Sequence, residues 1–370
     1  MKKSFLLLIV ILILVLIIAG CQSTEKQPEE EVSQQVEDTE ATEELTIIDE
    51  GQESVDNREE YYASPFTGRA ISKKSLNRVV MVSIENSPAA RPQSGLEDAD
   101  IIYEFLVEGG ITRFLALYWN NIPEKIGPVR SLRPYLIKTA LEYNPLLLHA
   151  GASPAGFNML SEVAINNLDQ IYKGKYYWRD GGRKRPHNLY TGYFKFDSYL
   201  NEITGQEYSS RFSFQQIKLM IEKDLNAKNI NIDYWGNYNV NYQYVPAKNK
   251  YNRFLYDHER PHLAENGEQL TAKNIIVQFV ETQVKDDEGR LTMELNGKGE
   301  ILVFRDGTVI KGYWEKEKDK LTKYYNEKAQ EIKLNPGQTW IQVVPRFTPI
   351  DYGSGDSDEQ RTQEKIDFSS

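Results

Sequence analysis

The side chains best suited to chemistry fall in three short stretches of a sequence that has only four histidines. The first stretch is "IGPVRSLRPY", in which Arg130 and Arg133 precede Pro134, and proline is favoured at the first position of a helix. The unpaired N–H groups and the positive dipole end of that helix would point the same way as the two guanidinium groups. The pattern therefore predicts a binding site for a carboxylate or a phosphate. The alternative is that these arginines pair with acidic side chains within the fold.

The second stretch is "HAGASPAG", which follows an apolar run ending at Leu148. Ser153 is a good N-cap, and Pro154 suits the first helical position. A nucleophilic role for Ser153 is not favoured, because the G-x-S-x-G pattern is not matched and Pro154 lacks the N–H that would stabilise an oxyanion. We therefore expect Ser153 to cap a helix whose start contacts a ligand. His149 is either a core residue or a ligand-binding residue at the carboxyl end of a strand.

The third stretch is "WRDGGRKRPHNLYT", a basic loop in which four Arg and Lys residues surround Asp180. His187 and Asn188 follow Pro186 and would offer hydrogen-bond donors in a fixed geometry. The loop's positive charge would raise the local potential for an anion, and loops on a rigid scaffold commonly carry function. These features predict that His187 and Asn188 bind a ligand; the alternative is a solvated loop.

Two glutamates are candidates for acid–base chemistry. Glu104 and Glu108 lie on a predicted β-hairpin over residues 101–119, with a Gly-Gly turn at 109–110. A two-residue turn would pair Glu104 with Leu115 and would place Arg113 on the same face as both glutamates. In that position Arg113 would keep both carboxylates ionised and structural.

An enzyme would use these groups differently. Glu104 or Glu108 would act as general acid or base, Arg130 and Arg133 would stabilise developing negative charge, and His187 would assist. This hypothesis requires at least one of the two glutamates to face Arg130 and His187.

No metal or other cofactor is predicted. His149 and His187 with one of the glutamates would make a plausible zinc ligand set, but no H-E-x-x-H spacing is present. His258 and His262 are four residues apart, and Pro261 between them indicates a loop rather than a helical face. Nucleic acid is not an expected partner, because the folded part is only mildly basic and no nucleic-acid-binding motif occurs.

The elements expected to position these residues divide into two regions. Residues 61–228 alternate strands and helices, with strands at 78–85 and 146–150 and helices at 153–167, 193–204 and 213–225, which predicts an α/β domain with a mixed sheet. From Asn229 to residue 350 the apolar residues alternate with period two, which predicts a mostly antiparallel β domain. Arg305–Thr308 has the composition of a hairpin turn.

The ends of the chain predict export and a lipid anchor. Two lysines precede the apolar run 5–19, and Ile18-Ala19-Gly20-Cys21 resembles a lipobox, so residues 1–20 would be a signal peptide and Cys21 would carry lipid. The alternative is an uncleaved anchor. Residues 22–60 hold fifteen acidic and two basic residues, so residues 21–60 are expected to form a disordered tether. Residues 351–370 are likewise expected to be a disordered acidic tail. Cys21 is the only cysteine, which excludes internal disulfides.

Four further stretches stand out beside the three above: "ARPQSGLEDADIIYEFLVEGGITRFLALY", "NRFLYDHERPH", "NIIVQFV" and "LNPGQTWIQVVP". Together these stretches resemble the YerB-like family of bacterial lipoproteins. This resemblance covers nearly all of residues 65–346 and implies two regions of unknown function, an extracytoplasmic location and no assigned catalytic residues.

Two functions remain open from the sequence. The favoured one is a membrane-anchored, extracytoplasmic protein that binds an anionic wall polymer or a partner protein through Arg130, Arg133, His149, His187 and the two helix starts. The alternative is a hydrolase or transferase that acts on the cell wall.

Overall fold

Five strands from the first half of the chain form one side of a mixed sheet in the computed structural model. The structure describes residues 62–72, 78–216, 225–234, 238–256, 260–318 and 320–354. The strands lie in the order β4 (Ile101–Leu106), β5 (Thr112–Tyr118), β3 (Val80–Glu85), β6 (Leu146–His149) and β7 (Asn166–Asp169). β3 runs antiparallel to β5 and parallel to β6, so the first half has the predicted mixed sheet.

Among the described residues of this half of the chain there are three α-helices: α2 (Pro134–Leu141), α3 (Pro154–Glu162) and α4 (Tyr193–Glu202). Ser153 caps α3, since its hydroxyl accepts a hydrogen bond of 3.2 Å from the backbone N–H of Gly156. This confirms the predicted cap. Leu136 and Ile137 of α2 are fully buried against one face of the sheet.

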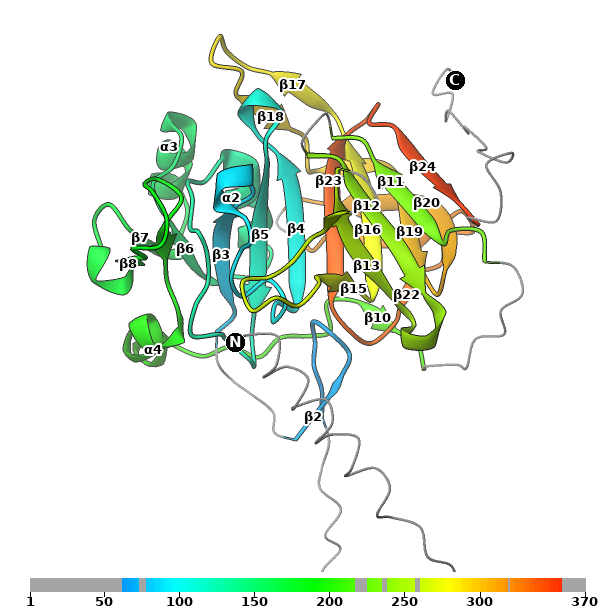
Figure 1. Cartoon of the computed structure of the whole chain (residues 1–370), viewed down its shortest axis with the longest axis horizontal. Coiled ribbons are helices and arrows are strands. Elements are labelled where there is room, and N and C mark those ends of the chain that lie inside the picture. Colours follow the sequence, from blue (N-terminus) through cyan, green and yellow to red (C-terminus); the bar gives the residue numbers. More distant parts are fainter. Residues whose placement is uncertain are drawn as a thin grey trace, which may run out of the picture. The chain divides into compact units, whose positions relative to one another are not determined.

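Five strands from the second half complete the same sheet, which has ten strands (Figure 1). They lie in the order β21 (Lys323–Asn326), β20 (Thr308–Lys316), β19 (Gly297–Arg305), β16 (Asn274–Val280) and β23 (Thr339–Pro345). β23 pairs in parallel with both β16 and β4, and so joins the two halves of the chain. Asp306 and Gly307 have positive φ between β19 and β20, which confirms the predicted hairpin turn.

A second sheet in the C-terminal half is antiparallel throughout. Its strands are β14 (Arg260–Pro261), β13 (Lys250–Leu255), β12 (Val240–Val245), β11 (Asn229–Ile232) and β24 (Ile350–Gly353), with β15 (Thr271–Ala272) also paired to β13. Shorter strands form four separate pairs: β1 (Tyr62–Ala63) with β2 (Ala70–Ile71), β8 (Trp178–Arg179) with β9 (Leu189–Tyr190), β10 (Ser213–Phe214) with β22 (Lys333–Leu334), and β17 (Thr282–Val284) with β18 (Leu291–Met293). The predicted fold class, an α/β region followed by a mostly antiparallel β region, is confirmed.

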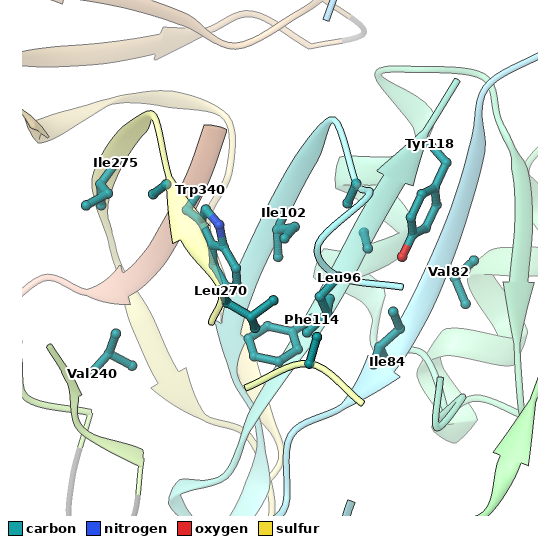
Figure 2. Close-up of a cluster of buried hydrophobic side chains, with 14 of the residues drawn as sticks. Val82, Ile84, Leu96, Ile102, Phe114, Tyr118, Val240, Leu270, Ile275 and Trp340 are labelled. Carbon is teal, nitrogen blue, oxygen red and sulfur yellow. The ribbon is translucent and has the colours of Figure 1, made fainter. Parts of the chain in front are cut away.

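The ten-stranded sheet has a hydrophobic core on each face. On the face toward the second sheet, Phe114 of β5 meets Trp340 of β23 edge to face, with ring centroids 5.6 Å apart (Figure 2). Tyr242 of β12 packs on Trp340 from the second sheet. These contacts join strands from both halves of the chain, so the two halves share one core.

The turn between β4 and β5 differs from the prediction. Glu108–Gly110 forms a short 3₁₀ turn, and the N–H of Val107 donates to the carbonyl of Ile111 at 2.7 Å. Glu104 therefore pairs with Phe114 instead of Leu115. A shift of one residue exchanges the two faces of a strand, so Arg113 lies on the opposite face from Glu104.

Two further boundaries differ or lie outside the described residues. β24 runs to Gly353, so the ordered chain continues past the predicted end at residue 350. The helix predicted over 213–225 starts instead as strand β10, and residues 217–224 are not described.

Cys21, the signal peptide, the tether and residues 355–370 also lie outside the described residues. Among the residues that are described, no helix has the length and apolarity to cross a membrane.

Candidate functional site

The candidate site lies where β3, β4 and β6 end, at the edge of the sheet where α/β proteins commonly bind ligands. The loop before α2 is fixed there by backbone hydrogen bonds to β3. The N–H of Glu85 donates to the carbonyl of Pro128 and the N–H of Arg130 donates to the carbonyl of Ser83, each at 2.8 Å. This pairing extends the sheet and holds Arg130 beside the last residue of β3.

Glu85 is the carboxylate that faces Arg130 and His187. Its Oε2 lies 3.0 Å from Nε of Arg130, and its Oε1 lies 2.8 Å from Nδ1 of His187. The hydroxyl of Ser87 donates to the same Oε1 at 2.6 Å. Because a carboxylate only accepts, Nδ1 of His187 carries the proton and Nε2 is the basic nitrogen. Glu85 was not among the site residues predicted from the sequence. The one feature that could have indicated it is the position of an acidic residue at the end of a buried strand.

Arg133 pairs with the second carboxylate of the site. Its Nε and Nη2 lie 2.5 Å and 2.9 Å from the two oxygens of Glu108, a bidentate arrangement. Burial alone would raise the pKa of Glu108, but hydrogen bonds and charge from Arg133 hold that pKa below its usual value. Glu108 is therefore an ionised counter-ion of Arg133, so of the predicted roles of general acid or base the acid role is not supported.

Arg113 lies between these two ion pairs and is more buried than either Arg130 or Arg133. Its Nη1 donates to the carbonyl of Ser131 at 2.7 Å, and its Nε has no hydrogen-bond partner among the described residues. Burial, together with the charges of Arg133 and Arg130, lowers the pKa of Arg113 to about 10. We call Arg113, Arg130 and Arg133 the arginine cluster. Its carboxylate partners in the described chain are Glu85 and Glu108, so positive charge is in excess.

Glu104 does not belong to this site. It lies on the other face of the sheet, fully buried, with its Oε2 2.8 Å from Nη2 of Arg253. Asn86 and Thr112 donate to its other oxygen at 3.2 Å and 2.8 Å. The prediction that Glu104 is a catalytic acid or base facing Arg130 is therefore wrong, because both of its oxygens are bound within the core on the opposite face of the sheet.

His149 is a core residue, and the prediction that it binds a ligand is wrong. Its side chain is fully buried, with Nδ1 3.0 Å from the carbonyl of Gly151 and Nε2 3.3 Å from Oδ1 of Asn167. Burial lowers the pKa of His149, so the ring is neutral at pH 7. His262 is likewise buried and neutral, because burial and the charge of Arg253 lower its pKa well below the usual value.

The basic loop is held against the body of the protein. Asn188 is buried and donates to the carbonyls of Asp180 and Arg183, which makes it a structural residue and not the predicted ligand-binding one. Arg183 in turn donates to the carbonyls of Ala90 and Pro92, each at 2.5 Å. These contacts leave His187, whose side chain is 25% exposed, as the residue of this loop that reaches the candidate site.

A cavity of about 160 Å³ adjoins the arginine cluster at Arg133. It lies between the first turns of α2 and α3 and the β17–β18 hairpin. Arg133 and Ser153, the residues at the two helix starts, line it, whereas Arg130, His149 and His187 do not. Across the described ranges, no cluster of three His, Cys, Asp or Glu side chains could hold a metal ion.

Comparison with known proteins identifies relatives of the whole folded region. The family described as "Protein of unknown function (DUF3048) N-terminal domain" matches residues 66–208, and its C-terminal domain matches residues 230–341. A protein of Bacillus subtilis (strain 168) named as a lipoprotein, YerB, is 32% identical over 307 residues, which are 79% of this chain and 89% of that protein. The crystal structure of B. subtilis YerB is similar, with a TM-score of 0.69 and 30% identity over 77% of this chain and 97% of that one.

Proposed function

Because the chain belongs to the YerB-like family of bacterial lipoproteins, we propose that it is anchored outside the cytoplasm through lipidated Cys21 and binds an anionic ligand of the cell envelope. The lipobox at Cys21 and the name of the Bacillus relative support the anchor. An acidic tether would be repelled by an anionic membrane surface, so it would hold the folded part away from the lipid.

The arginine cluster is the observation that carries the binding proposal. Arg113 and Arg133 both donate to Ser131, and Arg130 is its neighbour in the chain. Two carboxylates pair with Arg130 and Arg133, and the buried Nε of Arg113 has no hydrogen-bond partner among the described residues. Burying a charged donor without a partner is costly. A phosphate or carboxylate would supply the missing acceptor and the missing negative charge.

The test is binding of the full chain in detergent to poly(glycerol phosphate), to polyglutamate and to a neutral glycan. We expect both polyanions to bind, with an affinity that falls as salt rises, and the Arg130→Ala/Arg133→Ala variant to bind at least about tenfold more weakly. The control is Lys328→Ala, which removes an exposed cation from a distant turn. Unchanged binding by the double arginine variant would show that the arginine cluster does not bind the polyanions.

The Glu85–His187 pair favours a second candidate function, hydrolysis or transfer on a wall polymer. Glu85 orients His187 through Nδ1, which leaves Nε2 free to act as a general base beside Arg130. Ser87 is not its nucleophile, since the hydroxyl lies 3.3 Å from Nδ1, the protonated nitrogen. Release of products from purified wall by the native chain, and its loss in His187→Gln with polyanion binding retained, would establish this activity. An intact wall after incubation would exclude it for that substrate.

A further inference from the structure

The cavity between α2, α3 and the β17–β18 hairpin has more positive than negative charge. Its lining includes four basic side chains: Arg133, Lys138, Lys285 and Arg290. Glu108 neutralises Arg133, and Asp286 and Glu288 both pair with Arg290 at 3.0 Å. Within the described residues, neither lysine has an ion pair with an acidic side chain. The four cations therefore exceed these three carboxylates by one charge, and the two lysines are the cations left to face an occupant.

The rest of the lining is mostly apolar. Tyr135 of α2, Leu291 and Met293 of β18, and Pro154 and Ala155 of α3 all face this space. Met293 is 4% exposed and Tyr135 is 2% exposed, so the cavity is bounded by well-packed core side chains. Apolar walls beside unneutralised cations suit an occupant that is charged at one end and apolar at the other.

The volume limits the size of the occupant. About 160 Å³ is close to the roughly 150 Å³ of an engineered cavity that holds benzene. The part of a ligand that this open cavity encloses is therefore about six carbon atoms, comparable to a leucine side chain or a short alkyl chain.

We propose that this cavity binds the anionic end of an amphiphilic ligand, in which a carboxylate or phosphate is joined directly to a small apolar group. The apolar group would pack on Tyr135, Leu291 and Met293, and the anion would lie between Lys138 and Lys285. This inference rests on the proposed function, since it gives the chemistry of one end of the same anionic ligand. Two sources share this chemistry: the free carboxyl terminus of a short apolar peptide, and an alkyl phosphate.

The test monitors the methyl NMR signal of Met293 in the full chain. This signal is assigned by its loss in the Met293→Leu variant. The probes are N-acetyl-leucine, its neutral amide, n-hexyl phosphate and inorganic phosphate. At least one of the two amphiphilic anions should shift this signal with a dissociation constant of about 1 mM or below, and the preferred anion identifies the source. The neutral amide and inorganic phosphate should each bind at least about tenfold more weakly.

Variants separate this cavity from the arginine cluster. Lys138→Gln/Lys285→Gln should weaken binding of the anionic probe at least about tenfold, while Lys328→Ala, which removes an exposed cation outside the cavity, should leave it unchanged. Equal binding of N-acetyl-leucine and its amide, or no shift of Met293 by any probe, would overturn the inference. If polyanion binding still depends on Arg130 and Arg133 in that case, the proposed function stands without this cavity.

Discussion

The guanidinium of Arg253 lies 2.8 Å from the carboxylate of Glu104, and both side chains are fully buried between the two halves of the chain. Arg253 also donates to Nδ1 of His262 at 3.0 Å and to the hydroxyl of Tyr242 at 2.6 Å, and lies 4.4 Å above the ring of Trp340. Each polar group of this pair therefore has a partner, which is the condition under which a buried ion pair is tolerated.

Removing one member of this pair should be strongly destabilising. Arg253→Met leaves the Glu104 carboxylate buried without a counter-charge and should lower the free energy of unfolding by about 3–5 kcal/mol, measured by urea denaturation. The double variant Arg253→Met/Glu104→Gln should be less destabilised than Arg253→Met alone, because the buried charge is then gone. A single variant as stable as the native chain would contradict this account.

The cap of α3 makes a smaller contribution. Ser153→Ala removes the acceptor for the N–H of Gly156 and should lower the free energy of unfolding by about 1 kcal/mol. Ser153→Asp should retain most of the stability, since aspartate is an equally good N-cap. Thermal unfolding of the three proteins measures this, and an Ala variant with an unchanged melting temperature would argue against the cap.

Stability should fall in mild acid because of His262. The pKa of His262 in the fold is well below its usual 6.5, first because of burial and then because of the charge of Arg253. The unfolded chain therefore binds one more proton, and the stability present above about pH 6.5 is lost as the pH falls, at up to about 1.4 kcal/mol per pH unit. Urea denaturation of His262→Gln should show a smaller slope below that pH. If the slope for His262→Gln equals that of the native chain, another group causes the loss of stability in acid, for example His149, whose pKa is also lowered.

Asp100 should have the opposite pH dependence. Burial raises its pKa to about 7, although the charge of Arg69 and a hydrogen bond from the N–H of Trp119 act to lower it. The folded chain thus binds the extra proton, and this contribution to stability is lost as the pH rises toward 7. Asp100→Asn should be more stable than the native chain by roughly 1–2 kcal/mol at about pH 8, and the gain should shrink at about pH 5. Asp287→Asn, a substitution at an exposed turn residue, serves as the control in the same denaturation series. An equal gain for Asp100→Asn at both pH values would point to another cause.

The anchor gives a prediction in cells. Cys21→Ser should abolish incorporation of labelled fatty acid and should move the protein out of the lipid-modified membrane fraction. Fractionation with metabolic labelling measures both. Labelled lipid on the serine variant would place the modification at another residue.

Local signals were enough to predict several elements. Ser153 followed by Pro154 predicted the start of α3, and Arg305–Thr308 predicted the turn between β19 and β20. Both depend on the backbone preferences of residues next to one another in sequence. The alternation of apolar residues after Asn229 likewise predicted antiparallel strands, because the side-chain period of a half-buried strand is two.

The candidate site was harder to predict because it depends on register and on distant partners. The 3₁₀ turn at Glu108–Gly110 shifted the β4–β5 register by one residue and moved Arg113 to the face opposite Glu104. Glu85, which pairs with both Arg130 and His187, is far from them in sequence. Only the folded chain brings these three residues together.

The position of β23 has a consequence for when the chain can fold. β23 lies in the interior of the ten-stranded sheet, between β16 and β4, yet residues 339–345 are synthesised long after residues 101–106 of β4. Until they arrive, β4 keeps an unpaired edge, and Phe114 lacks the ring of Trp340 that it packs against. Pairing of such distant segments is slow. A chain built in this way cannot close its ten-stranded sheet from its N-terminal half alone, so completion of that sheet waits for residues 339–345.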